Sequence, residues 1–99
     1  MPYLEIISDK DRRRFALGQG PVNIGRCPTN MIRLDDDLTS RAHCVIEMTP
    51  QGYQLRDLAS CNGTYVKEKE IKTVLLNHGD EFQVGVTMFR FVHTEADGN

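Results

Sequence analysis

Apolar and polar residues alternate in short runs along the chain. Residues 12–17, 42–48 and 53–57 carry apolar side chains at every second position, which is the spacing of a strand with one buried face. No stretch of about ten residues shows the three- and four-residue apolar spacing of a helix. Together with local enrichment in β-branched and aromatic residues, the pattern predicts strands at residues 3–8, 12–17, 22–24, 42–48, 53–57, 81–84 and 88–92.

Turn-forming residues separate these predicted strands. The chain reads DKD at 9–11, GQGP at 18–21 and PQG at 50–52, and Gly85 lies between the last two strands. Many short strands with turns between them are typical of a β-sandwich or a β-barrel. We therefore predict an all-β domain.

Composition narrows the class of protein. The 99 residues, 39% hydrophobic and 26% charged, are ordinary for a soluble globular protein and suffice for one domain. The net charge of -2 argues against a nucleic-acid partner, because such proteins usually present a strongly basic face. No apolar run approaches the ~20 residues of a membrane helix, so we expect no contact with a membrane.

The cysteines indicate a cellular compartment and argue against a metal site. Cys27, Cys44 and Cys61 cannot all pair with one another, and the opening MPYLE is too short and polar for a secretory signal. We expect a reducing, cytoplasmic location. The cysteines and histidines show neither C-x-x-C nor H-x-x-x-H spacing, so we expect no metal and no cofactor.

Three polar connections between the strands are rich in turn formers, and loops on a sheet scaffold often carry binding residues. They are residues 25–31, 35–41 and 58–63. Their candidate anion-binding side chains are Arg26 in the first, Ser40 and Arg41 in the second, and Ser60 and Asn62 in the third. Ser40 and His43 lack the surroundings of a nucleophile elbow, so we expect no enzyme.

Four sequence blocks resemble the signature of the forkhead-associated (FHA) domain family. They are GR at 25–26, SRAH at 40–43, DLASCNGTYV at 57–66 and LNHGDEFQVG at 76–85. The blocks follow the family's order and lie near its spacing, and the resemblance covers about residues 3–92. It implies a two-sheet antiparallel β-sandwich of the FHA/SMAD-like type, with binding loops at one end. We expect the domain to span residues 1–94, followed by a flexible tail or linker at 95–99.

The resemblance implies a phosphothreonine-dependent interaction module in intracellular signalling, whose partner is a protein or peptide containing phosphothreonine. Arg-rich sites of this kind are a general means of reading phosphorylated motifs. Arg26 and Ser40 match the family's phosphate contacts, and Asn62 matches the residue that holds the ligand backbone. Arg41 matches a variable position that contacts phosphate or peptide. Cys61 stands where many relatives carry threonine, and a thiol is only a weak donor.

Three further residues match positions that support the binding loops. Gly25 and Gly63 match glycines that let the chain turn tightly, and His43 matches a histidine that braces the loops by hydrogen bonds. The chemistry of the ligand is consistent with phosphate contacts from Arg26 and Ser40, since phosphothreonine carries about -1.5 to -2 charges and three strong acceptor oxygens. The planar guanidinium of Arg26 and the hydroxyl of Ser40 are suitable donors for such a group.

Some alternatives remain open at this stage. Ser40 and the Asn62–Gly63 pair are also common turn residues, and Arg26 and Arg41 are also ordinary surface cations. A phospho-independent interaction or assembly domain that keeps the fold is the second functional class. The acidic run at 35–37 directly precedes the Ser40 block, and we predict that it disfavours acidic residues flanking the phosphothreonine. The oligomeric state is not predicted.

Overall fold

The computed structural model describes residues 2–8 and 12–93 of the chain. The described residues do not include the turn predicted at 9–11 or the tail predicted at 95–99. The proposed domain limit at residue 94 also lies outside them. The described part contains strands and no helix. The strands are β1 (Tyr3–Ile7), β2 (Arg12–Ala16), β3 (Val22–Gly25), β4 (Ile32–Arg33), β5 (Cys44–Thr49), β6 (Gly52–Asp57), β7 (Thr64–Val66), β8 (Lys69–Ile71), β9 (Thr73–Leu75), β10 (Glu81–Val84) and β11 (Thr87–Val92).

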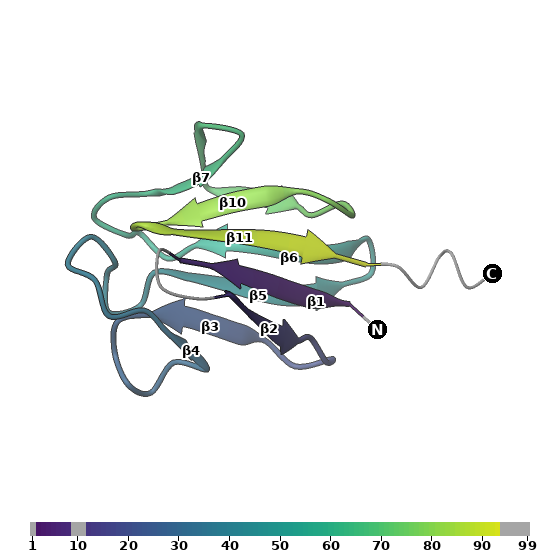
Figure 1. Ribbon diagram of the computed structural model, residues 1–99. Helices are drawn as coiled ribbons and strands as arrows, with labels where there is room; N and C mark the ends of the chain where they lie inside the picture. The colour runs from purple at the N-terminus through teal and green to yellow at the C-terminus, as the bar shows by residue number, and fades with distance from the viewer. Residues whose placement is uncertain (1, 9–11, 94–99) are drawn as a thin grey trace.

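The strands form two sheets that face each other as a sandwich (Figure 1). One sheet has the order β2-β1-β11-β10-β7-β8, and the other has the order β4-β3-β5-β6-β9. The predicted all-β sandwich is therefore confirmed. One pair departs from the antiparallel expectation, because β3 and β4 run parallel and pair Ile24 with Ile32. The loop between them returns the chain to its original direction, which a hairpin does not do.

The core lies between the two inner faces. Phe82 and Phe89 are fully buried and stack with ring centroids 4.9 Å apart. Cys44 and Ile46 are buried as the alternation predicts, whereas Met48 on the same strand is 47% exposed. Met48 lies near the end of β5, close to the β5–β6 turn. Burial of aromatic and aliphatic side chains is the main force holding the sheets together.

Four strands have no counterpart in the predicted set, namely β4, β7, β8 and β9. Each is two or three residues long, and β8 and β9 contain no fully buried side chain. Such short segments cannot show a period of two, so sequence pattern alone does not reveal them. Their pairing with β3, β10 and β6 holds them in the sheets.

Three connections meet at one end of the sandwich, on the left in Figure 1. We call residues 25–31 the first loop, residues 35–41 the second loop and residues 58–63 the third loop. β1 begins and β11 ends at the opposite end of the sandwich (Figure 1). The three loops therefore lie away from the start of β1 and the end of β11, and they form the candidate binding end of the sandwich.

The β7–β8 hairpin contains a strained two-residue turn. Lys67 and Glu68 have φ angles of 52° and 68°, and Val66 pairs with Lys69 across the turn. Hairpin turns with two positive φ angles strongly favour Asn-Gly. The double substitution Lys67→Asn and Glu68→Gly is therefore expected to raise the free energy of unfolding by about 1 kcal/mol.

Urea denaturation of the variant beside the unchanged protein measures this effect. Gln51→Gly in the β5–β6 turn is the matched control, because Gln51 does not have a positive φ and glycine there only adds freedom to the unfolded chain. The control is expected to lose stability. A double variant that is no more stable than the unchanged protein contradicts the assignment of strain to this hairpin.

Candidate functional site

Backbone hydrogen bonds join the first loop to the second. The N–H of Arg26 donates to the carbonyl of Ser40 at 2.9 Å, and the N–H of Cys27 donates to the carbonyl of Arg41 at 3.2 Å. The side-chain amide of Asn30 donates to the same Arg41 carbonyl at 2.7 Å. These bonds bring Arg26, Ser40 and Arg41 together, although 14 residues separate Arg26 from Ser40 in the sequence.

Gly25 makes this close approach possible. A Cβ atom at this position would collide with the backbone carbonyl of Arg41 and would lie 2.7 Å from the side-chain nitrogen of Asn30. Gly25 was expected to allow a tight turn, but its φ is not positive. Its role is to let the second loop cross directly over the end of β3. Gly63, in contrast, has a φ of +89°, a conformation that disfavours other residues.

His43 links the second loop to the third from inside the protein. The ring is fully buried, its Nδ1 accepts from the Ser40 N–H at 3.0 Å, and its Nε2 lies 2.9 Å from the Gly63 carbonyl. A carbonyl only accepts and an N–H only donates, so the two bonds together require a neutral ring that carries its proton on Nε2. Both loop backbones are thereby fixed relative to β5.

The third loop is organised around Asp57, at the end of β6. One carboxylate oxygen accepts from the Ser60 hydroxyl at 2.6 Å and from the Thr64 hydroxyl at 2.8 Å, and the other accepts from the Ser60 N–H at 3.1 Å. The Ser60 oxygen in turn accepts from the Gly63 N–H at 2.9 Å. The proposal of Ser60 as an anion-binding side chain is therefore wrong, because its hydroxyl donates to Asp57. The role of Asp57 was not predicted from the sequence.

These bonds make stability depend on pH. Burial raises the pKa of the Asp57 carboxyl, but hydrogen bonds from Ser60 and Thr64 outweigh it, and the pKa lies below its ordinary value of 3.8. The stabilisation is present above about pH 3.8 and is lost as the pH falls through the lower pKa of the folded state. Asp57→Asn is expected to lower the free energy of unfolding by about 1–2 kcal/mol at pH 7, because the amide replaces an acceptor with a donor.

Urea denaturation between pH 7 and pH 2 tests this expectation. The stability difference between the two proteins is expected to narrow below about pH 3.8, where the native carboxylate is also neutralised. Asp37→Asn, at an exposed position in the second loop, is the control and is expected to change stability little. A difference that stays constant across the whole range contradicts the role of the ionised carboxylate.

The second and third loops also meet at the surface. The Cys61 N–H donates to the Ser40 hydroxyl oxygen at 2.9 Å, and the Asn62 side-chain amide donates to the Leu38 carbonyl at 2.9 Å. Cys61 and Asn62 are exposed, and Ser40 is partly exposed. The bonds leave the Ser40 O–H, one Asn62 N–H and the Asn62 carbonyl oxygen available to a ligand. The structure thus brings these three residues together on one accessible surface.

Arg26 and Arg41 lie beside this surface. The Nε of Arg26 donates to the Thr39 carbonyl at 3.1 Å, which orients its guanidinium. Within the described part of the chain, no carboxylate lies within 4.0 Å of either arginine. Both line a hollow of about 300 Å³ together with Cys27. The Thr29 hydroxyl lowers the pKa of the Cys27 thiol, and the charge of Arg41 adds to this effect, as expected where cations gather.

Arg33 is a further residue at this hollow, and the sequence analysis did not identify it. It lies on β4, is exposed, and donates from Nε to the Arg26 carbonyl at 3.0 Å. No motif contains it, and a two-residue strand gives no sequence signal. Its Nη2 lies 3.8 Å from Asp35, which is longer than a hydrogen bond.

The acidic run that precedes Ser40 does not act as one surface. Asp36 accepts from the Leu38 N–H at 2.9 Å and from the Thr39 hydroxyl at 2.8 Å, so it closes the turn of the second loop. Gly85, in the β10–β11 turn, packs directly against Asp36 and Thr39. Asp35 and Asp37 are the members of the run that remain exposed.

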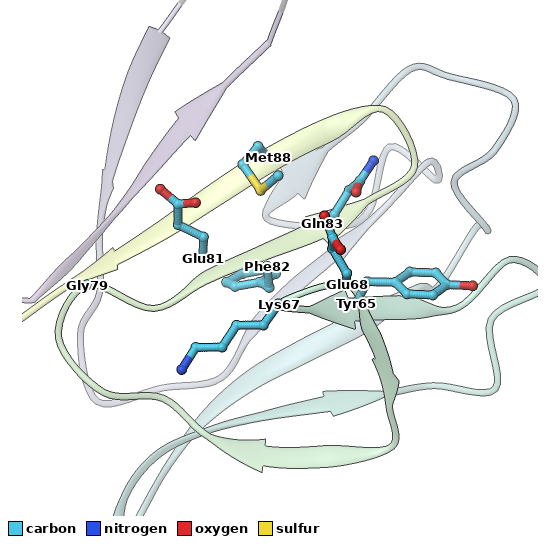
Figure 2. A pocket seen from close by; sticks show the side chains of 8 residues that line it. All are labelled: Tyr65, Lys67, Glu68, Gly79, Glu81, Phe82, Gln83 and Met88. Carbon is cyan, nitrogen blue, oxygen red and sulfur yellow. The ribbon is translucent and has the colours of Figure 1, made fainter.

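Another hollow, of about 480 Å³, lies on the outer face of the sheet that contains β7, β10 and β11 (Figure 2). Tyr65, Gln83 and Met88 line it from the neighbouring strands β7, β10 and β11. Its charged residues are one cation, Lys67, and two anions, Glu68 and Glu81. This balance does not favour an anionic ligand, so the hollow is not a second candidate for the phosphate.

The described residues offer no metal site. Across residues 2–8 and 12–93, no three His, Cys, Asp or Glu side chains group closely enough to hold a metal ion. All three cysteines are free thiols, and burial raises the pKa of Cys44 to about 12, so it packs as a neutral core residue. No helix in the described part could cross a membrane.

Residues 22–85 match the family model of the FHA domain. The chain is also 39% identical, over 79 residues, to the glycogen accumulation regulator GarA of Mycolicibacterium smegmatis. That match covers 80% of this chain and 49% of the regulator. The chain thus spans about half the length of the curated relatives it matches.

Two solved structures show the same architecture. The FhaA FHA domain, solved in complex with the intracellular domain of Rv3910, superposes with a TM-score of 0.84 at 31% identity, over 92% of this chain and 99% of that one. Mycobacterium tuberculosis EmbR, solved in complex with a low-affinity phosphopeptide, superposes with a TM-score of 0.82 at 33% identity. In that case 91% of this chain and 24% of EmbR are covered.

Proposed function

This chain belongs to the FHA domain family, and on that premise we propose that its loop end binds phosphothreonine in a partner protein. The observation that carries the proposal is the meeting of Arg26, Ser40, Arg41 and Asn62 on one accessible surface, held by hydrogen bonds between the three loops. The complex of EmbR with a phosphopeptide supports a ligand of this chemical class.

The proposed contacts follow from the donors that remain available. The Arg26 guanidinium binds two phosphate oxygens through its Nη groups, because its Nε is already engaged with the Thr39 carbonyl. The Ser40 hydroxyl donates to phosphate while its oxygen accepts from the Cys61 N–H. Arg41 contributes a second cation at the rim. Each charge-assisted bond contributes roughly 1.5–3 kcal/mol net.

The peptide on either side of the phosphate adds the remaining contacts. The free carbonyl oxygen and N–H of Asn62 are suited to hold the ligand backbone, as an added strand residue would. Ordering a flexible peptide opposes binding, so we expect a dissociation constant around micromolar. This corresponds to a binding free energy of roughly −8 kcal/mol. Gly25, His43 and Gly63 act on binding only through the positions of the loops.

We propose that this part of the protein acts by binding and not by catalysis. The relative GarA is named a regulator and another relative, from Corynebacterium jeikeium, is named an oxoglutarate dehydrogenase inhibitor. An intracellular, phosphorylated protein is the partner that fits the site. The competing function is phospho-independent assembly through a sheet face such as the one in Figure 2.

Three matched peptide libraries test the proposed function. Each has degenerate flanks and a fixed centre, which is phosphothreonine, phosphoserine or threonine. Titration by fluorescence anisotropy is expected to give the strongest binding with phosphothreonine and none measurable with threonine. Phosphoserine is expected to bind about tenfold more weakly, since one methyl group in a pocket contributes about 1–3 kcal/mol. Equal binding of all three libraries would overturn the proposal and favour the phospho-independent alternative.

A further inference from the structure

We propose that Arg33 forms a second anion-binding subsite beside the phosphothreonine site. The subsite selects ligands that carry another negatively charged group, a carboxylate or a second phosphate, within about three residues of the phosphothreonine. This inference rests on the proposed function, because it describes the ligand of the same loop end. It concerns the flanking residues of the ligand, about which the family's signature blocks say nothing here, since Arg33 lies outside them.

Arg33 lies beside the proposed phosphate contact, Arg26. Arg26, Arg33 and Arg41 line one hollow of about 300 Å³, which joins β4 to the first and second loops. An extended peptide advances about 3.3–3.6 Å per residue. A ligand whose phosphate rests on Arg26 therefore reaches Arg33 with a side chain one to three residues away.

Arg33 is also held in place before any ligand arrives. Its Nε donates to the Arg26 carbonyl at 3.0 Å, so the guanidinium is anchored through one nitrogen next to the proposed phosphate contact. The two Nη groups remain for a ligand. A side chain fixed in this way loses less entropy on binding than a free one.

The charged residues that line the hollow favour an anionic ligand. Three arginines line the hollow, and Asp35 is the anion among the residues that line it. Asp35 lies 3.8 Å from Arg33, and the two side chains are 83% and 50% exposed, so solvent weakens their attraction. A phosphate or carboxylate in a ligand can therefore take the place of Asp35. A hydrogen bond from Thr29 is the largest cause of the lowered pKa of Cys27, which shares the hollow, and the charges of Arg41 and Arg33 add to it.

The inference reverses the sequence-based hypothesis that the acidic run at 35–37 disfavours acidic flanks. Asp36 accepts hydrogen bonds within its own turn. Asp35 faces Arg33, so it partly neutralises that cation without making the hollow acidic. Arg33 shifts the balance of this surface towards anions, and Asp35 limits the effect.

The test uses a phosphothreonine peptide on a neutral alanine–serine background. A glutamate or a phosphoserine is placed at each position from −3 to +3 in turn, and affinities are measured by fluorescence anisotropy. With the unchanged protein, one or two neighbouring positions are expected to tighten binding roughly three- to tenfold. The two series separate carboxylate from phosphate recognition, because a second phosphate carries more charge.

Variants at the subsite sharpen the result. Arg33→Gln is expected to abolish the gain and to leave the affinity for the neutral phosphothreonine peptide within about twofold. Asp35→Asn is expected to increase the gain, and Arg33→Glu is expected to replace it with a preference for lysine at the same positions. Arg56→Gln, on β6 and paired with Glu47, is the matched control and is expected to change nothing.

The outcomes separate this inference from the proposed function. If the neutral phosphothreonine peptide does not bind the unchanged protein, both are wrong. If it binds but no anionic position improves affinity, or if the gain survives Arg33→Gln, only the subsite is wrong. Loss of the neutral peptide with Arg33→Gln while thermal unfolding is unchanged assigns Arg33 to the phosphothreonine site itself, which also overturns a separate subsite.

Discussion

Replacing His43 with alanine is expected to lower the free energy of unfolding by about 3 kcal/mol. The substitution removes a fully buried ring and leaves the Ser40 N–H and the Gly63 carbonyl without their partner. Buried polar groups that lose a hydrogen bond each cost roughly 1–3 kcal/mol. The same change is expected to weaken phosphopeptide binding, because His43 sets the positions of the second and third loops.

Urea denaturation and a phosphopeptide titration measure the two effects of His43→Ala. His78→Ala is the matched control, since His78 is exposed and accepts one bond from the His93 N–H. The control is expected to change stability by no more than about 0.5 kcal/mol. A His43→Ala protein with normal stability and normal affinity contradicts the role of this histidine as the link between the loops.

Arg26→Ala is expected to weaken phosphothreonine binding about ten- to hundredfold. The substitution removes the guanidinium that the proposal places on the phosphate, and a charge-assisted hydrogen bond is worth roughly 1.5–3 kcal/mol. Stability is expected to fall by less than about 1 kcal/mol. Arg26 keeps its backbone bond to Ser40 and loses one side-chain bond, to the Thr39 carbonyl.

Isothermal titration with one phosphothreonine peptide provides the measurement for Arg26→Ala. Arg26→Lys keeps the charge without the planar fork and is expected to recover only part of the affinity. Arg56→Ala controls for the loss of one positive charge at a distant surface, where the arginine pairs with Glu47 at 3.1 Å. If Arg26→Ala binds as tightly as Arg56→Ala, the phosphate does not rest on Arg26.

The sequence predicted the sandwich well wherever a strand is long enough to show its period. β5, β6 and β11 each alternate or carry large apolar residues, and the structure places them within two residues of the predicted bounds. The short strands β4, β8 and β9 were not predicted, because two or three residues cannot display an alternation. Their place in the sheets depends on long-range pairing, which local sequence does not encode.

The sequence predicted most residues of the candidate site but not the hydrogen bonds and contacts between them. Arg26, Ser40, Cys61 and Asn62 were proposed from three of the four sequence blocks, and the structure brings them together. Ser60 was proposed for the wrong task, because only the fold shows that its hydroxyl donates to Asp57. The role of Gly25 likewise depends on the Arg41 carbonyl, 16 residues away in the sequence.

Arg33 could not be identified from sequence motifs. It belongs to no sequence block, and its nearness to Arg26 arises from the parallel pairing of β3 with β4. A cation in such a position has no signal in a single sequence, because many exposed arginines have no role. The fold supplies the missing information by placing three arginines around one hollow.

The proposed function places phosphothreonine at the loop end and not on a sheet face. Amide chemical shifts of the ¹⁵N-labelled protein, followed while a phosphothreonine peptide is added, distinguish these two locations. The largest shifts are expected in residues 25–31, 35–41 and 58–63, and the unphosphorylated peptide is expected to cause none. Shifts centred on Tyr65, Gln83 and Met88, or equal shifts with both peptides, would contradict the claim.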